Sequence, residues 1–128
     1  MAKYAHPNVL DNGPQYIKSN CHLVALLDAY TFGDSYAPAT GNIMASAAMV
    51  TGDFTLGNSG NDRALTTAAG KQDAAADAGG PASHFAFLDT VNSRVLWVTE
   101  ETTGQTIVVG NPVTFPSLVY TSKQPVAP

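Results

Sequence analysis

Histidines are the first residues in this chain to test for chemistry, because imidazole is the most versatile general base and metal ligand in proteins. There are three of them, at His6, His22 and His84. None has the H-E-x-x-H spacing that places two imidazoles on one helix face around zinc. His22 and His84 each stand at the expected start of a strand, where we predict hydrogen-bonded, structural imidazoles.

Acidic and sulfur-containing side chains do not indicate catalysis more strongly. Glu100 and Glu101 are adjacent, and neighbouring strand residues point to opposite faces, so the two make a poor general acid and base pair. We expect them at a solvent-exposed strand end. Cys21, the single cysteine, opens an apolar run and is predicted to be a buried, unreactive thiol rather than a nucleophile or redox sensor.

Two glycine-containing stretches match known binding loops only in part. Residues 57–60 (GNSG) lack the G-x-S-x-G pattern of a nucleophile elbow, and Gly70-Lys71-Gln72 lacks the Ser or Thr of a phosphate-binding loop. Asn58, Asn61 and Asp62 lack the ligand spacing of a calcium loop and are predicted to form a turn. The sequence therefore predicts no catalytic residue, no cofactor and no metal. A small hydrolase whose site forms only in three dimensions is the enzymatic alternative.

The composition restricts the class of partner. The chain has 128 residues, enough for one domain, and one cysteine, which excludes an intrachain disulfide. Charged residues make up 12% of the chain, about half the usual share, and the net charge is −4. Because there is no basic stripe to hold phosphates, we expect no direct binding to nucleic acid. Such a surface suits a protein partly covered by neighbours, and equally an ordinary compact β protein.

The start of the chain, MAKYAHP, has no apolar signal region. The longest candidate for a membrane span, at residues 23–27, is far too short to cross a bilayer. We therefore expect a protein that is made in the cytoplasm and does not associate with a membrane. Any extracellular location would follow from release or assembly rather than secretion.

The clearest structural pattern lies at residues 84–99, HFAFLDTVNSRVLWVT. Phe85 and Phe87 recur at period two, and Val95 and Trp97 do so after a short polar link. This pattern predicts two adjacent antiparallel strands joined by a loop. Because both faces of each run are apolar, we expect the hairpin to be central in a sheet and covered on two sides.

The remaining patterns predict one short helix followed by several strands. The helix is expected to have Asp11 or Asn12 as its cap and Pro14 in its first turn, and to end near Asn20. Residues 42–50 fit a strand or a helix, and residues 71–78 are predicted as an edge strand. The predicted fold is mainly β: an antiparallel β-sandwich or small barrel with one short N-terminal helix and extended terminal arms.

The expected organisation is a single β-rich domain at residues 9–120 between two extended segments. The N-terminal arm covers residues 1–8, where Pro7 restricts His6 to extended geometry. The C-terminal tail covers residues 121–128. Extended arms of this kind can add a strand to the exposed sheet edge of a neighbour.

Aromatic side chains in the arms, the helix and the long connection at residues 29–41 are the candidate interface residues, because such anchors carry much of the binding energy at protein surfaces. The alternative for each tyrosine is a core position with its hydroxyl at the rim. The predicted interface residues are Tyr4, His6, Tyr16, Tyr30, Phe32, Tyr36 and Tyr120.

Three parts of the chain carry a resemblance to a known family: AHPNVLDNGPQYIKSN at the start, GDFTLGNSGNDRALTTAAGK in the middle, and SHFAFLDTVNSRVLWVTEET followed by VTFPSLVY near the end. Together they resemble small proteins that coat the heads of tailed bacteriophages, known as decoration or cement proteins. The opening is similar to a recurring H-P-D-V-L-D-x-x-L-x-Y-I-K phrase of such proteins. The chain differs in carrying Gly13-Pro14 where relatives more often have helix-forming residues, which bears on the length of the helix.

The resemblance implies a non-enzymatic virion protein, assembled in the host cytoplasm, that binds the major capsid protein on the outer surface of the head and stabilises the mature shell. It also implies self-association as a trimer or dimer. The alternative is a ligand- or carbohydrate-binding β module of a phage head fibre or tail. In that case the loop aromatics Tyr30, Phe32 and Tyr36 would serve as stacking platforms.

Overall fold

The elements of the computed structural model, which describes residues 7–100 and 106–124, follow one another with short connections. In chain order they are α1 (Pro7–Asn20), β1 (Leu23–Leu27), α2 (Tyr36–Gly41), β2 (Ile43–Ala48), the 3-10 turn η1 (Thr51–Asp53), β3 (Phe54–Ser59), β4 (Asp62–Thr67), β5 (Lys71–Asp73), β6 (Gly80–Pro81), β7 (His84–Asp89), β8 (Arg94–Glu100), β9 (Thr106–Ile107), β10 (Val113–Phe115) and β11 (Val119–Ser122).

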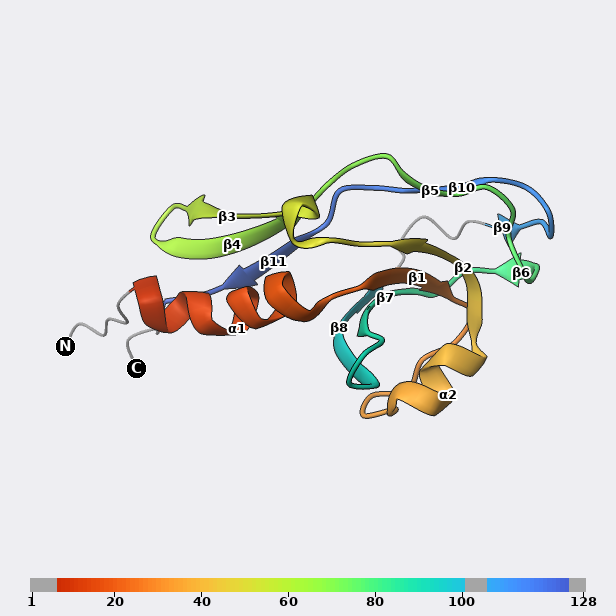
Figure 1. The fold of residues 1–128 in the computed structure, drawn as a ribbon, viewed down its shortest axis with the longest axis horizontal. Coiled ribbons are helices and arrows are strands. Elements are labelled where there is room, and N and C mark those ends of the chain that lie inside the picture. Colours follow the sequence, from red (N-terminus) through yellow and green to blue (C-terminus); the bar gives the residue numbers. More distant parts are fainter. Residues whose placement is uncertain (1–6, 101–105, 125–128) are drawn as a thin grey trace.

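The described strands form four small antiparallel sheets rather than a closed barrel. A four-stranded sheet has the order β2-β1-β7-β8, and a three-stranded sheet has the order β11-β4-β3. Two strand pairs, β10-β5 and β6-β9, complete the set. Figure 1 shows α1 running along the three-stranded sheet at one end of the molecule, with α2 beside the four-stranded sheet at the other end. The predicted mainly β, antiparallel fold with a helix near the N-terminus is confirmed.

The predicted hairpin at residues 84–99 is present as β7 and β8, which pair antiparallel from His84 opposite Glu100 to Asp89 opposite Arg94. The register shifts so that Phe87 faces Trp97 and Leu88 faces Val95, which makes Leu96 the bulged residue. β7 lies between β1 and β8, whereas β8 is at the edge of the sheet as described. The expectation of a central hairpin is therefore confirmed for β7 and wrong for β8. Sequence periodicity reports burial of side chains, and does not report which strand is the last in a sheet.

Both faces of the four-stranded sheet carry apolar side chains, because alternate residues of a strand point in opposite directions. One face joins a large core shared with the three-stranded sheet and the β5–β10 pair. Its buried members include Val24, Leu26, Met44, Phe54, Leu65, Phe85, Phe87 and Phe115. The opposite face is a smaller cluster of Ala25, Leu27, Ala86 and Leu88, against which Tyr30 and Tyr36 pack. The segment between β1 and β2 is thus needed to cover the second face.

A chain of aromatic rings links the two larger sheets. The ring of Phe87 is stacked on Trp97, with centroids 4.4 Å apart and planes 11° apart. Tyr120 of β11 meets the ring of Trp97 edge-on, with centroids 5.4 Å apart. Phe54 of β3 meets the ring of Phe87 with centroids 6.4 Å apart. Offset and edge-to-face contacts of this kind add roughly 0.5–1.5 kcal/mol each beyond area burial. They hold β3, β7, β8 and β11 together.

The N-terminal helix is longer than predicted, since it begins at Pro7 and contains Pro14 in its interior. A proline there removes one backbone hydrogen bond and costs about 3 kcal/mol. Pro14 is nevertheless almost fully buried, and Ile17 and Cys21 follow it at helical spacing with exposures of 5% and 3%. Tertiary burial of this face therefore outweighs the local preference that predicted a helix start near Asp11.

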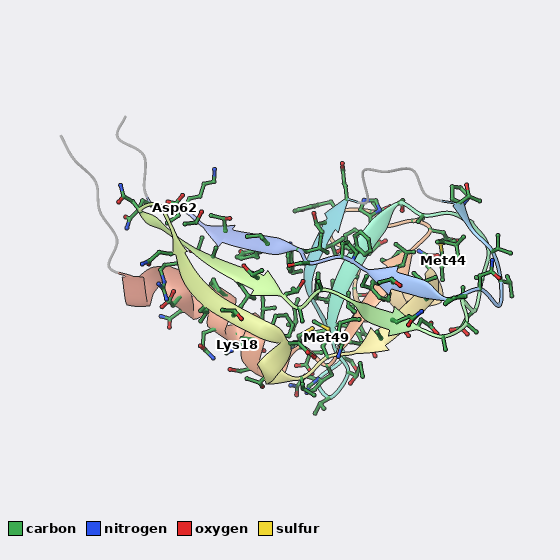
Figure 2. The ribbon with its side chains drawn as sticks, turned by 90° about the horizontal axis from the view of Figure 1, so that it is seen from above. Lys18, Met44, Met49 and Asp62 are labelled. Atoms are coloured by element: carbon green, nitrogen blue, oxygen red, sulfur yellow. The ribbon has the colours of Figure 1, made fainter. Side chains whose placement is uncertain are left out.

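Polar contacts fix α1 to the three-stranded sheet. Lys18 donates hydrogen bonds to the carbonyl oxygens of Phe54 and Thr51. Arg63 on β4 forms an ion pair with Asp11, with Nε and Oδ1 2.7 Å apart. Figure 2 shows Lys18 on the helix and Asp62 at the tip of the β3–β4 hairpin, with Met44 toward the opposite end of the molecule.

The boundaries of the predicted arms change. Pro7 and Asn8 belong to α1, so of the predicted N-terminal arm only residues 1–6 remain, and these lie outside the described residues. Thr121 and Ser122 belong to β11, where they pair with Ala64 and Arg63. The remainder of the predicted tail includes residues 125–128, which also lie outside the described part of the chain.

The structure decides three further internal expectations. Of the stretch 42–50, for which a strand and a helix were both open, residues 43–48 form the strand β2, and α2 is a second short helix that was not predicted. The predicted edge strand at residues 71–78 ends at Asp73. There the carboxylate of Asp73 accepts hydrogen bonds from the backbone N–H groups of Ser46 and Ala75, which turns the chain away from the sheet. No helix among the described residues is long and apolar enough to span a membrane.

The ring chain gives a first prediction. Phe87→Ala is expected to lower the free energy of unfolding by about 3–5 kcal/mol, because Phe87 is 1% exposed and contacts three elements. Trp97→Ala is expected to cost less, because Trp97 is only partly buried at the sheet edge. Urea unfolding of the purified variants measures both. Val91→Ala, at a 75% exposed valine of the same hairpin, is the control and should change stability by less than about 0.5 kcal/mol. Equal losses for Phe87→Ala and Val91→Ala would contradict this account of the core.

Candidate functional site: a groove along the edge of β8

The predicted interface residues fall at separate places in the structure. Tyr4 and His6 lie outside the described residues. Tyr16 is 43% exposed on α1 and accepts a hydrogen bond from Arg94. Tyr120 packs against Trp97 and is part of the core rim. The loop aromatics, in contrast, are close to one another, and two of them, Tyr30 and Phe32, line a common groove.

The groove runs along the outer edge of β8 and has a volume of about 590 Å³. One wall is the strand itself, and the other is the segment that follows β1. The lining residues are Tyr30, Phe32, Gly33, His84, Val95, Leu96, Trp97, Val98, Thr99 and Glu100. Six of these are consecutive in β8, so the groove follows the main chain of an edge strand. Sequence reasoning identified Tyr30 and Phe32 but missed the β8 edge.

A network of hydrogen bonds shapes the wall opposite β8. The backbone N–H of Thr31 donates to the carboxylate of Asp34 at 3.0 Å, and the N–H of Asp34 donates back to the carbonyl of Thr31 at 2.9 Å. The Tyr30 hydroxyl donates to the carbonyl of Asp34 at 3.2 Å. Gly33 has a φ of +90°, a conformation that glycine adopts without strain. The turn holds Phe32 outward, fully exposed at its tip.

His84 lies at the end of the groove and is held by its neighbours. Its ring packs against Tyr30 with centroids 6.0 Å apart, and its Nδ1 lies 2.7 Å from the hydroxyl oxygen of Ser83. A nucleophilic Ser–His pair also needs a group that orients the second imidazole nitrogen. Glu100 stands opposite His84 in the β7–β8 register. The ion pairs among the described residues are His22–Asp89, Arg63–Asp11 and Lys71–Asp53. His84 is in none of them, so among these residues no carboxylate is ion-paired with its ring to orient it.

A second polar cluster, at the other end of the hairpin, was missed by sequence reasoning. Asp89 is fully buried and accepts hydrogen bonds from the backbone N–H groups of Val91 and Asn92 and from the Asn92 side chain at 2.8–3.0 Å. His22 Nδ1 lies 3.2 Å from Asp89 Oδ1, within ion-pair distance but without the alignment of a hydrogen bond. The D-T-V-N spacing at the hairpin turn was the available signal, since Asp favours such turns.

The electrostatics of Asp89 assign it a structural role. The side chain and backbone N–H of Asn92 lower the pKa of the Asp89 carboxyl from its ordinary value of 3.8. Burial acts in the opposite direction, and the N–H of Val91 and nearby His22 add to the lowering. A carboxylate that accepts this many hydrogen bonds stays ionised and satisfied at neutral pH. It closes the turn between β7 and β8.

Cys21 is buried as predicted, at the junction of α1 and β1. Burial raises the pKa of its thiol to about 11, and hydrogen bonds with the backbone of Leu23 and Leu88 only partly oppose this. The thiolate, which is the reactive form, is therefore scarce at neutral pH. Within residues 7–100 and 106–124, no three His, Cys, Asp or Glu residues are grouped so that they could hold a metal ion.

Comparison of the chain with protein-family models, with curated proteins and with solved structures gives no match.

The turn carboxylate gives a pH-dependent prediction. Because the pKa of Asp89 is lowered on folding, its contribution to stability is present above pH 3.8 and is lost as the pH falls through the lower folded-state pKa. Asp89→Asn is therefore expected to be less stable than wild type at pH 7, and the difference should shrink as the pH is lowered below 3.8. Denaturant unfolding at several pH values between roughly 2 and 7, a range that includes the titration of carboxylates, measures the difference. Asp77→Asn, at an exposed carboxyl, is the control; a pH-independent difference for Asp89→Asn would contradict the assignment.

The thiol gives a second prediction. At pH 8, Cys21 in the folded protein should react with a chromogenic disulfide reagent at least about a hundredfold more slowly than in urea, because its thiolate fraction is reduced by a pKa of about 11. Absorbance after mixing follows the reaction in both states. Equally fast labelling of the folded and unfolded chains would show that Cys21 is accessible.

Proposed function

We propose that this chain is a non-enzymatic structural protein of a phage virion, which binds the shell of the major capsid protein on the outer surface of the head and stabilises it. The resemblance of three parts of the sequence to phage decoration proteins is the starting point. A rigid β core that holds out an aromatic side chain at a preformed turn is well suited to such a role.

Phe32 is the observation that carries the proposal. Its side chain is fully exposed, yet the turn that bears it is fixed by hydrogen bonds to and from Asp34. An aromatic anchor that is already ordered loses little conformational entropy when it enters a pocket of a partner. The proposed role of Phe32 is insertion into the capsid surface.

A low charge and a small interface are compatible with strong attachment when many copies act together. Each copy that bridges two capsid subunits gains a second contact at high effective concentration, so modest interfaces of roughly 800 Å² per partner suffice. Bridging of this kind resists outward pressure on the shell because separation of subunits requires several contacts to break together.

Carbohydrate binding is the second candidate, and the groove beside β8 is what favours it. Tyr30, Phe32 and His84 present rings around a space of about 590 Å³, and sugars stack on such rings. As a carbohydrate-binding module of a phage head fibre or tail, the monomer would bind host polysaccharide in solution. Titration of the purified protein with that polysaccharide distinguishes the candidates, since a decoration protein needs only the shell.

The attachment test uses expanded heads that lack this protein. Wild-type protein is expected to bind them at a fixed number of copies per head and to raise their resistance to heat. Phe32→Ser should weaken attachment at least about tenfold, in line with loss of an interface anchor, with an unchanged melting temperature. Sedimentation of heads with bound protein gives the occupancy.

Val91→Ser is the matched control, because Val91 is also an exposed apolar residue at a turn. It should leave attachment unchanged. Failure of the wild-type protein to occupy heads, or occupancy without added heat resistance, would overturn the proposed function. Equal effects of the two substitutions would show that Phe32 is not the anchor.

A further inference from the structure

β8 is the edge strand of the four-stranded sheet among the described residues. Six of its seven residues pair with β7 on one side, Leu96 being the bulge, and no other described strand pairs with it on the other side. Edge strands usually carry lysine or proline, or are covered, because their free main-chain groups can pair with another chain. The sequence of β8, RVLWVTE, has neither lysine nor proline. Residues 95–100 of this strand line the groove of about 590 Å³.

The sequence of β8 is complementary to itself in the antiparallel direction. In a register centred on Trp97, Arg94 of one copy lies opposite Glu100 of the other, and this pair occurs twice. Between these ends, Val95 meets Thr99 and Leu96 meets Val98. Opposite charges and β-branched residues directly across from each other stabilise antiparallel pairs. A register shifted by one would place Arg94 opposite Glu101 instead, so the Arg94–Glu100 register is the one that pairs opposite charges within residues 94–100.

We propose that β8 of one copy pairs antiparallel with β8 of a second copy, joining two four-stranded sheets into one sheet of eight strands across a two-fold axis. A contact of this kind is isologous and closes after two copies. Main-chain hydrogen bonds supply affinity, as in other cases of strand addition, and the end charges set the register.

The bulge at Leu96 decides where the pairing must be anchored. Bulges on edge strands increase local twist and weaken pairing nearby. The ends of β8 are regular, and they hold the two charged residues, so the Arg94–Glu100 contacts have to stabilise the dimer. Both side chains are exposed, and the guanidinium of Arg94, which donates one hydrogen bond to Tyr16, has further N–H donors to offer a carboxylate. The inference is independent of the proposed function, because it concerns the purified protein alone.

The experiment is a charge swap read by sedimentation equilibrium. The wild-type chain is expected to form a dimer, and Glu100→Arg should raise its dissociation constant on the order of tenfold or more, because two attractive pairs become repulsive. Arg94→Glu combined with Glu100→Arg should restore the dimer. Asp77→Arg has the same change in charge away from β8 and should leave the dimer intact.

Circular dichroism confirms that each variant is folded, and amide hydrogen exchange of the wild type provides a measurement without mutation. β8 amides should become more protected as the protein concentration rises. A monomeric wild type, a dimer insensitive to Glu100→Arg, or concentration-independent exchange in β8 would overturn the proposal. A folded double variant that stays monomeric would overturn the register. None of these outcomes bears on binding to heads.

Discussion

The structure depends on one packing arrangement, the contact of Phe87 with the ring of Trp97 on the neighbouring strand β8 and with the ring of Phe54 in the three-stranded sheet. Phe87 is buried between Trp97 at 4.4 Å and Phe54 at 6.4 Å, and Tyr120 extends the chain of rings to β11. Small antiparallel sheets bury too little area to be stable alone. Because the rings connect the two larger sheets, their strands share one core. Lys18 and Arg63 hold α1 against the three-stranded sheet.

A sheet that is apolar on both faces needs a cover on each. The large core covers one face, and the segment with Tyr30 and Tyr36 covers the other. That segment is long enough to turn outward at Gly33 and place Phe32 beside the edge of β8. The groove is therefore a consequence of how the second face is covered. Tyr30, Leu96 and Trp97 pack against the two core clusters and also line the groove.

The polar side chains at the two ends of the β7–β8 hairpin differ in burial. Asp89, at one end of the hairpin, is buried, ionised and fully engaged with its turn. At the other end, His84 and Glu100 border the groove. The exposed charges Arg94 and Glu100 stand at the two ends of the seven-residue strand β8.

The sequence by itself determined the strands of the hairpin, the burial of Cys21, the mainly β class and the presence of a turn within residues 57–62, although the structure confines that turn to residues 60–61 between β3 and β4. Alternation and glycine-rich turns are local properties. It also identified Tyr30 and Phe32, together with Tyr36, as candidate binding residues of one loop. Only the tertiary structure decided that α1 continues through Pro14, that Tyr120 belongs to the core rim, and that β8 is an edge. These outcomes depend on which surfaces meet. Burial of Pro14 and Ile17 against a distant sheet offsets a local cost, and the order of strands is set by contacts between residues far apart in the chain, which no local pattern contains.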